Sequence, residues 1–309
     1  MTTQITGVYN ILATPFTPDG AIDEASLRRL VSFQLNIKAY GLTILGVLGE
    51  SAKMSVSERR GVMALVVEAV NGRAPVIVGV SHPDAATVIA LSKAAFEAGC
   101  AGVMIAPPRI EAPTDEQIYG LYADYAAGFD GTIIVQDFPP VNGVIMSPEV
   151  LARIAENIPN ARYLKLEDPP LMQKIGAICE RTDKFAIFGG LGGMFFLEEL
   201  ERGAAGTMTG FAFTEILVAV YEAYRKGDLA AATRIFDHYL PLIRFENQPI
   251  INLSIRKALL QRRGAISHAN LRTPFAPIDD GTQQEIDRVL ARVGISDPTQ
   301  KIAFDTAAI

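Results

Sequence analysis

Eight short apolar runs alternate with helix-like stretches along the first two thirds of the chain, and this alternation constrains the fold more than any other feature. The runs cover residues 7–13, 42–47, 75–80, 102–106, 132–136, 162–166, 185–188 and 206–209. Several are apolar at nearly every position, as expected of strands buried on both faces of a parallel sheet. Eight such strand–helix repeats predict a closed (β/α)₈ TIM barrel. The spacing also permits an open doubly wound sheet, but no GxGxxG motif follows the first run, which disfavours a dinucleotide-binding domain.

Helix boundaries support the same division of the chain. Ser55-Val-Ser-Glu58 has the pattern of a capping box, and Ser147-Pro148 places a capping residue before a proline in the first helical position. After Phe213 the pattern is helical throughout, with apolar residues at helical spacing in 215–226, 229–243, 250–263 and 283–293. We therefore predict a barrel over residues 1–225 and a C-terminal helical extension over residues 226–309.

Composition excludes several classes of protein. Hydrophobic residues make up 49% of the 309 residues and charged residues 20%, unlike a disordered chain. The net charge is −6 with no dense Lys/Arg stretch, which argues against a nucleic-acid partner. The apolar runs are too short to span a membrane, and the first residues lack the pattern of a secretory signal. Cys100 and Cys179 are too few for a disulfide scaffold, so a cytoplasmic protein is expected.

Lys165 is the most informative candidate for chemistry. Functional side chains of a barrel gather at the carboxyl ends of its strands. In Tyr163-Leu164-Lys165-Leu166, alternation places the leucines on the outer face and Lys165 inside the barrel. Burial there favours the neutral amine, the form that attacks a carbonyl carbon. The alternative is a structural lysine paired with a barrel carboxylate such as Asp137.

Three other strand ends carry weaker candidates. The turn at 46–51 can present backbone N–H groups to a carboxylate, or can be only a tight turn from strand to helix. His82 can carry protons, or can be a loop residue that makes one hydrogen bond. Arg109 can bind a substrate carboxylate, or can form an ion pair at an interface. His82, His238 and His268 lie in separate segments, and no cluster with carboxylates predicts a metal site.

These residues, in this order, resemble the dihydrodipicolinate synthase / N-acetylneuraminate lyase family over nearly the whole chain. Residues 46–51 resemble the family's Gly-Thr-Thr-Gly-Glu-Ser carboxylate-binding turn, and residues 134–139 stand where the family has a Tyr-Asn-x-Pro strand end. Residues 163–167 resemble its Schiff-base strand, and Phe188-Gly189-Gly190 its following glycine turn. The resemblance implies a barrel with a C-terminal helical extension and a 2-oxo acid held covalently on Lys165, without a cofactor.

The resemblance also implies which residues form the site. The catalytic positions are Lys165, Gln136 and His82. The substrate-binding positions are Val47, Leu48, Gly49, Glu50, Ser51, Arg109, Gly189, Gly190 and Met208. It further implies a homotetramer in which the loop at 107–113 approaches a neighbouring subunit's site.

The chain departs from the family pattern at several of these positions. Val47 and Leu48 replace both threonines of the carboxylate-binding turn, and Gln136 replaces the tyrosine that relays protons. A glutamine has no accessible titration and cannot do that work. Val141 stands where the synthases have an arginine for the second substrate.

The closest likeness in motifs is to the 2-keto-3-deoxy-L-arabonate dehydratase branch. It rests on Val135-Gln-Asp137, on His82, on residues 206–210 and 240–243, and on Glu246-Asn247. The branch implies a Schiff-base lyase that acts on a 2-oxo acid, as a 2-keto-3-deoxy sugar acid dehydratase or aldolase. The alternatives are a synthase that condenses pyruvate with an aldehyde, and a barrel that binds a 2-oxo acid without turning it over.

Overall fold

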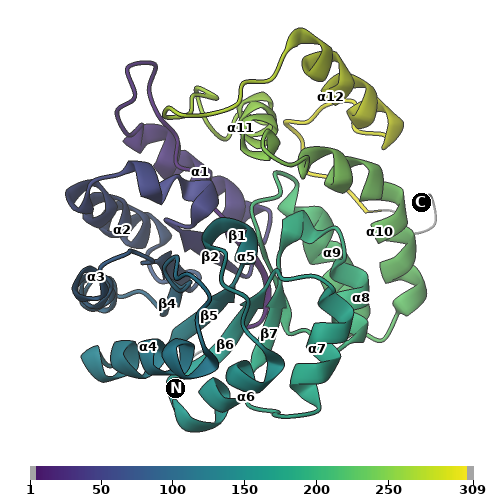
Figure 1. The fold of residues 1–309 in the computed structure, drawn as a ribbon. Coiled ribbons are helices and arrows are strands. Elements are labelled where there is room, and N and C mark those ends of the chain that lie inside the picture. The colour runs from purple at the N-terminus through teal and green to yellow at the C-terminus, as the bar shows by residue number, and fades with distance from the viewer. Residues whose placement is uncertain (1–4, 305–309) are drawn as a thin grey trace.

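A closed barrel of parallel strands forms the centre of the molecule (Figure 1). The computed structural model describes residues 5–304, and within them eight strands pair in sequence order, with β1 also pairing β8 to close the barrel. The strands are β1 (Gly7–Ile11), β2 (Gly41–Ile44), β3 (Val76–Gly79), β4 (Gly102–Ile105), β5 (Ile133–Asp137), β6 (Ala161–Leu166), β7 (Ala186–Gly189) and β8 (Gly206–Thr209). The predicted (β/α)₈ barrel is confirmed.

Helices surround the strands and continue beyond the barrel. The barrel helices are α1 (Glu24–Asn36), α2 (Val56–Val70), α3 (Ala85–Glu97), α4 (Asp115–Gly128), α5 (Pro139–Asn142), α6 (Pro148–Asn157), α7 (Leu171–Cys179), α8 (Phe196–Glu201) and α9 (Thr214–Arg225). The extension holds α10 (Leu229–Glu246), α11 (Asn252–Arg262) and α12 (Asp280–Arg292). Short 3₁₀ turns lie at Val47–Gly49, Ser51–Lys53 and Leu191–Gly193.

The sequence patterns placed most helix starts correctly. Ser55 forms the expected capping box with Glu58, and the Ser147 side chain accepts the Val150 N–H. The last helix begins three residues earlier than the predicted 283, because the Asp279 side chain caps it by accepting the Thr282 N–H at 2.7 Å.

Apolar side chains form two separate cores. The smaller core fills the inside of the barrel and contains Ile5, Tyr9, Ile11, Ile77, Met104, Ile134, Phe188 and Met208. The larger core lies between the strands and the helices, and it includes Leu164 and Leu166 of β6. The alternation of each strand between the two cores determines which residues can reach the barrel mouth.

The extension lies on one side of the barrel, with α11 beside α1 and α10 along α9 (Figure 1). Polar contacts join it to α1, where Arg29 donates to the Gly264 carbonyl at 3.2 Å and the Ser267 N–H donates to the Ser26 hydroxyl at 2.9 Å. Residue 225, where we divided the chain, is the last residue of α9.

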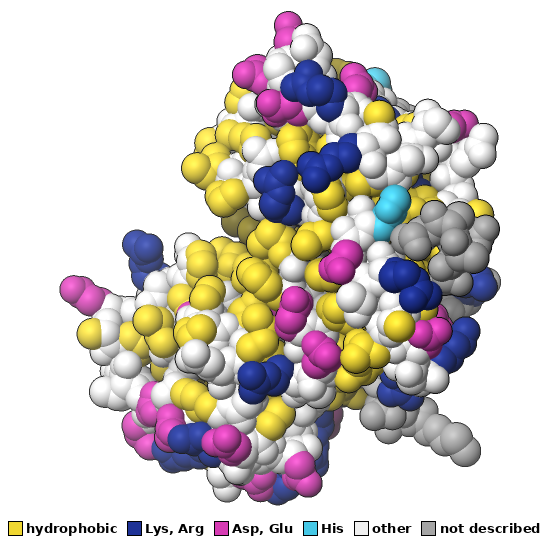
Figure 2. Space-filling model, turned by 90° about the vertical axis from the view of Figure 1, so that its right-hand side faces the viewer, with side chains coloured by type: hydrophobic (Ala, Val, Ile, Leu, Met, Phe, Trp, Pro, Cys, Tyr) yellow, Lys and Arg dark blue, Asp and Glu magenta, His cyan; other side chains and the backbone are white. Residues whose placement is uncertain are grey.

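The surface carries hydrophobic patches among its charges. Figure 2 shows hydrophobic side chains gathered toward the middle of one face, with charged side chains around them. In the described part of the chain, no helix combines the length and the hydropathy that crossing a bilayer requires.

Candidate active site

Lys165 points into the barrel, as strand alternation predicted. It lies on β6 between Gln136 of β5 and Phe188 of β7 in the strand register, and only 3% of the residue is exposed. Its Nζ lies 2.7 Å from Oε2 of Glu167, which is also buried. A buried amine needs a charged partner of this kind to offset the loss of hydration.

The carboxylate paired with Lys165 is that of Glu167 and not that of Asp137, the example considered from the sequence. Asp137 follows Gln136 on β5, so its side chain leaves the strand on the opposite face. There Oδ2 accepts from Lys174 of α7 at 2.5 Å, and Lys174 also contacts Asp168 at 2.7 Å. Burial raises the pKa of the Asp137 carboxyl to about 6, although Lys174 acts in the opposite direction.

Glu167 links Lys165 to Gln136. The Gln136 Nε2 donates to the same Glu167 oxygen, Oε2, at 3.0 Å. Glutamine supplies an oriented donor but no proton that titrates, whereas the carboxylate can accept and return one. We did not predict Glu167 as a site residue. The spacing Lys165-x-Glu167 places both side chains on the inner face of β6 and could have identified it.

A third buried carboxyl, that of Glu199 of α8, lies against Gly189 at the end of β7. The residue is 1% exposed, and Oε2 has no hydrogen-bond partner within residues 5–304. Burial, reinforced by the negative charge of Glu167, raises the pKa of the Glu199 carboxyl to about 8. The group therefore holds its proton at neutral pH.

Gly189 and Gly190 make room for these carboxyls. A Cβ on Gly189 would collide with the Glu199 carboxyl, and a Cβ on Gly190 would lie 2.5 Å from Oε1 of Glu167. The predicted glycine turn thus leaves room at the end of β7 for the carboxyls of Glu199 and Glu167. The Glu167 carboxyl is the one that contacts Lys165.

The predicted carboxylate-binding turn consists of two 3₁₀ turns joined at Glu50. β2 ends at Ile44, earlier than the predicted residue 47, and Leu45 has a positive φ of 56°. Val47 is exposed, Leu48 is half-buried, Gly49 is buried and Ser51 is half-buried. Their predicted contacts with substrate stay predictions.

Glu50 holds this turn against the extension. Its Oε1 accepts from Lys257 Nζ at 2.6 Å, and its Oε2 accepts from Lys53 Nζ and from the Arg272 N–H, both at 3.0 Å. Burial lowers the pKa of Lys257 to about 8, against the influence of Glu50. All of these contacts favour a positioning role for Glu50 over direct contact with substrate.

None of the remaining predicted residues forms a hydrogen bond or ion pair with Lys165 within residues 5–304. His82 is half-buried, and its Nδ1 accepts the Asp84 N–H at 3.0 Å in the turn that leads to α3. Arg109 is exposed in the loop after β4. Met208 is fully buried in the inner core on β8, two strands from Lys165.

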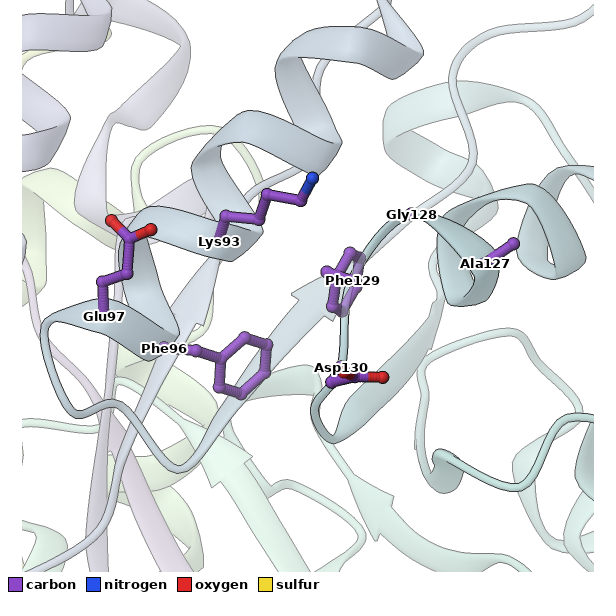
Figure 3. Close-up of a pocket in the computed structure, with 7 residues that line it drawn as sticks. All are labelled: Lys93, Phe96, Glu97, Ala127, Gly128, Phe129 and Asp130. Carbon is purple, nitrogen blue, oxygen red and sulfur yellow. The ribbon is translucent and has the colours of Figure 1, made fainter.

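A depression elsewhere on the surface is not part of this site. Figure 3 shows it between the ends of α3 and α4, where Lys93, Phe96 and Glu97 face residues 127–130. It lies at the amino end of β5, whereas Lys165 and Glu167 lie at the carboxyl end of β6. Residues at the amino-terminal face of a barrel serve stability rather than catalysis.

The described residues contain no group of three or more His, Cys, Asp or Glu side chains arranged to hold a metal ion. The chemistry of the mouth is that of a buried amine and carboxyls.

The chain is similar to known proteins over nearly its whole length. The chain is 32% identical over 293 residues to an L-2-keto-3-deoxyarabonate dehydratase from Azospirillum brasilense, covering 93% of this chain and 94% of that protein. It is 32% identical over 294 residues to a 4-hydroxy-tetrahydrodipicolinate synthase from Rhizobium meliloti, covering 94% and 98%. A crystal structure of dihydrodipicolinate synthase from Rhodopseudomonas palustris matches with a TM-score of 0.90 at 36% identity, covering 94% of this chain and 99% of that one. The family model of the dihydrodipicolinate synthetases matches residues 4–293, and the chain belongs to that family.

Proposed function

We propose that this protein is a Schiff-base-forming lyase that acts on a 2-oxo acid, as a 2-keto-3-deoxy sugar acid dehydratase or aldolase. The observation that carries the proposal is the 2.7 Å contact between the buried Lys165 Nζ and the Glu167 carboxylate. This pairing gives the amine a base that can remove its proton within the barrel mouth. The similarity to an L-2-keto-3-deoxyarabonate dehydratase supports a sugar acid as the substrate.

The proposed reaction begins with a covalent adduct. Glu167 takes a proton from the Lys165 ammonium, and the neutral amine attacks C2 of the 2-oxo acid. The carbinolamine oxygen receives a proton and leaves as water, which yields a protonated imine. The imine draws electrons from C3, so a C3 proton is lost and an enamine forms. No cofactor is needed, because the iminium nitrogen accepts the electron pair.

The protonated imine therefore has two possible outcomes, of which only the first passes through loss of the C3 proton. In a dehydratase, the C4 hydroxyl is protonated and leaves as water, and hydrolysis of the imine releases Lys165. In an aldolase, a 4-hydroxy substrate loses the proton of that hydroxyl instead of the C3 proton. The C3–C4 bond then breaks to give an aldehyde and the same kind of enamine. In both cases we assign the proton transfers to Glu167, which Gln136 orients through its 3.0 Å hydrogen bond.

A condensation of pyruvate with an aldehyde is the second candidate. The similarity to a 4-hydroxy-tetrahydrodipicolinate synthase supports it. Two residues argue against it. Val141 of α5 is 50% exposed and offers no charge to a second carboxylate, and Gln136 relays no proton. A barrel that binds a 2-oxo acid without turnover is the third candidate, and the Lys165–Glu167 pairing argues against it.

Borohydride reduction tests the covalent step. The wild type is incubated with pyruvate or with a 2-keto-3-deoxy sugar acid and reduced with borohydride. Its intact mass is then measured by mass spectrometry. We expect one adduct per chain, none in Lys165→Ala, and a normal adduct in Lys93→Ala, which removes an exposed lysine of α3. An adduct of normal yield in Lys165→Ala would overturn the assignment.

A turnover assay over a panel of 2-oxo acids tests the reaction class. We expect the highest kcat/KM with a 2-keto-3-deoxy sugar acid, and product analysis separates water loss from C3–C4 cleavage. Adduct formation with every acid but turnover of none would support the binding barrel.

We also propose a homotetramer. The exposed Arg109 and the hydrophobic patches of the surface (Figure 2) are features that an interface would cover. Light scattering at working concentration gives the mass, and a fully active monomer would contradict the proposal.

A further inference from the structure

Arg256 of α11 is a buried cation, and one nitrogen of its guanidinium group, Nη1, makes no hydrogen bond within the described residues. The residue is 1% exposed, and its Nε donates to Oε1 of Glu246 at 2.6 Å. Its Nη1 is buried as well. An unpaired donor in the interior is costly, so a buried guanidinium group that is left half-bonded calls for an explanation.

The free Nη1 lies beside Gly210, the residue that follows β8. It lies 3.0 Å from the position of a Cβ on Gly210, and Leu48 Cδ1 lies 2.9 Å from that same position. Met208 of β8 faces the inner core, so alternation turns the position of Gly210 inward as well. The absence of a side chain at Gly210 therefore lets the guanidinium group reach the mouth beside the turn at 46–51.

Glu246 holds the arginine in this orientation. Its Oε2 accepts the Ala212 N–H at 3.0 Å while its Oε1 takes the Arg256 Nε. The carboxylate is thus fixed to the backbone just after β8. A planar guanidinium group held on its Nε side presents its remaining N–H groups in a fixed direction, which suits a carboxylate.

We propose that Arg256 binds the carboxylate of the 2-oxo acid, and the inference rests on the proposed function. The turn at 46–51 offers Val47 and Leu48 where hydroxyl side chains would donate hydrogen bonds. Arg256 supplies a charged donor at the same turn, from the extension rather than from the barrel. The preferred substrate is consequently a free acid, and its uncharged amide binds without help from this residue.

The extension also provides a matched control. Arg263 is equally buried and paired with Glu215, but each of its nitrogens is bonded. Nε donates to the Pro298 carbonyl at 3.1 Å, Nη1 to the Ala212 carbonyl at 2.6 Å, and Nη2 to Glu215 at 2.5 Å. Loss of Arg263 therefore removes a buried ion pair of the same kind without removing a donor that faces the mouth.

The test compares pyruvate with pyruvamide in the borohydride trapping assay. In Arg256→Gln, we expect the pyruvate concentration for half-maximal trapping to rise about 10- to 100-fold, as for the loss of a hydrogen bond to a charged group. The value for pyruvamide should stay within twofold of the wild type, and both values should be unchanged in Arg263→Gln. An unchanged value for pyruvate, or an equal rise for both ketones, would overturn the inference.

A second variant and a second ligand keep the test decisive. Arg256→Lys keeps the charge beside Glu246 and serves if Arg256→Gln does not fold. In Arg256→Lys, the concentration for half-maximal trapping should rise for pyruvate but not for pyruvamide. If the wild type forms no adduct with either ketone, the proposed function fails, and lactate, which has a hydroxyl in place of the keto group, tests the arginine alone. Lactate should then raise the Tm of the wild type and of Arg263→Gln but not of the Arg256 variant. Equal stabilisation of all three, or of none, would overturn the inference.

Discussion

The Nζ of Lys165 and the Oε2 of Glu167 lie 2.7 Å apart, on side chains that leave β6 two residues from each other on its inner face. Lys165 is held by pairing with β5 and β7, and the Glu167 N–H, just beyond the end of β6, donates to the Asp137 carbonyl at 2.9 Å. The nucleophile and its base are therefore positioned by one strand, and Gln136 on the neighbouring strand restrains the base.

Replacement of Glu167 should separate turnover from adduct formation. In Glu167→Gln we expect kcat to fall by about 10²- to 10⁴-fold, because the group that moves protons is lost. Borohydride trapping with pyruvate should still reach completion, more slowly. Glu198→Gln, on the exposed side of α8, is the control and should keep normal turnover. Near-normal kcat in Glu167→Gln would remove this carboxylate from the mechanism.

Replacement of Glu199 should change how stability depends on pH. The pKa of Glu199 is raised by burial from 4.5 to about 8, so between these values the folded state holds a proton that the unfolded state has lost. The free energy of unfolding of the wild type therefore decreases with rising pH in this window, by about 1.4 kcal/mol per pH unit from this residue. We expect the free energy of unfolding of Glu199→Gln, measured with urea at pH 5 and pH 7, to decrease by about 1.4 kcal/mol less per pH unit than that of the wild type. Equal slopes for both proteins would contradict the assignment.

Loss of Lys257 should destabilise the protein. It leaves the buried Glu50 carboxylate without its contact at 2.6 Å, and breaking a buried ion pair from one side costs about 3 kcal/mol. We expect Lys257→Met to lower the free energy of unfolding by about this amount. The double variant Glu50→Leu/Lys257→Met should lose less than the sum of its single variants, as measured by urea unfolding. Additive losses would mean that the two residues act independently.

Replacement of His82 should have little effect on the reaction. Its Nδ1 already accepts the Asp84 N–H at 3.0 Å, which favours a local structural role over proton transfer. We expect His82→Asn to keep turnover within a few-fold of the wild type and to leave the shape of the pH–rate profile unchanged. If turnover falls by about 10²-fold while trapping persists, His82 carries protons after all.

Synthase activity with pyruvate and aspartate semialdehyde should be minor compared with turnover of the best sugar acid. Val141 is exposed on α5 and cannot pair with a second carboxylate. Val141→Arg adds that charge at a position with room for it, and it should raise any residual synthase rate. Turnover by the wild type that matches the best sugar acid would show that a different residue binds the second substrate.

The barrel and its lysine could be predicted because both depend on local patterns. The regular alternation of strand-like runs with helix-like stretches predicted β8 with its observed bounds, Gly206–Thr209. Alternation along β6 then directed Lys165 inward. The same alternation along β5 puts Gln136 on the inner face and therefore predicts that Asp137 faces outward, where it contacts Lys174.

Glu199 and Arg256 could not be found in this way. Each lies on a helix outside the strands, where a charged residue ordinarily faces water. Glu199 packs against Gly189 and Arg256 packs against Gly210, and both glycines lie at strand ends outside these helices. Helical periodicity describes one helix face and carries no information about which strand that face covers.

The contacts of Glu50 with Lys257 and Arg272 also have a consequence for synthesis of the protein. A nascent chain that has emerged from the ribosome as far as Thr209 contains every strand of the barrel, yet the turn after β2 still lacks the partners that hold it. Truncation or proteolytic cleavage after the barrel would likewise remove Lys257 and Arg272 from Glu50. These contacts of the turn are therefore completed late in translation, when the segment around Arg272 reaches it.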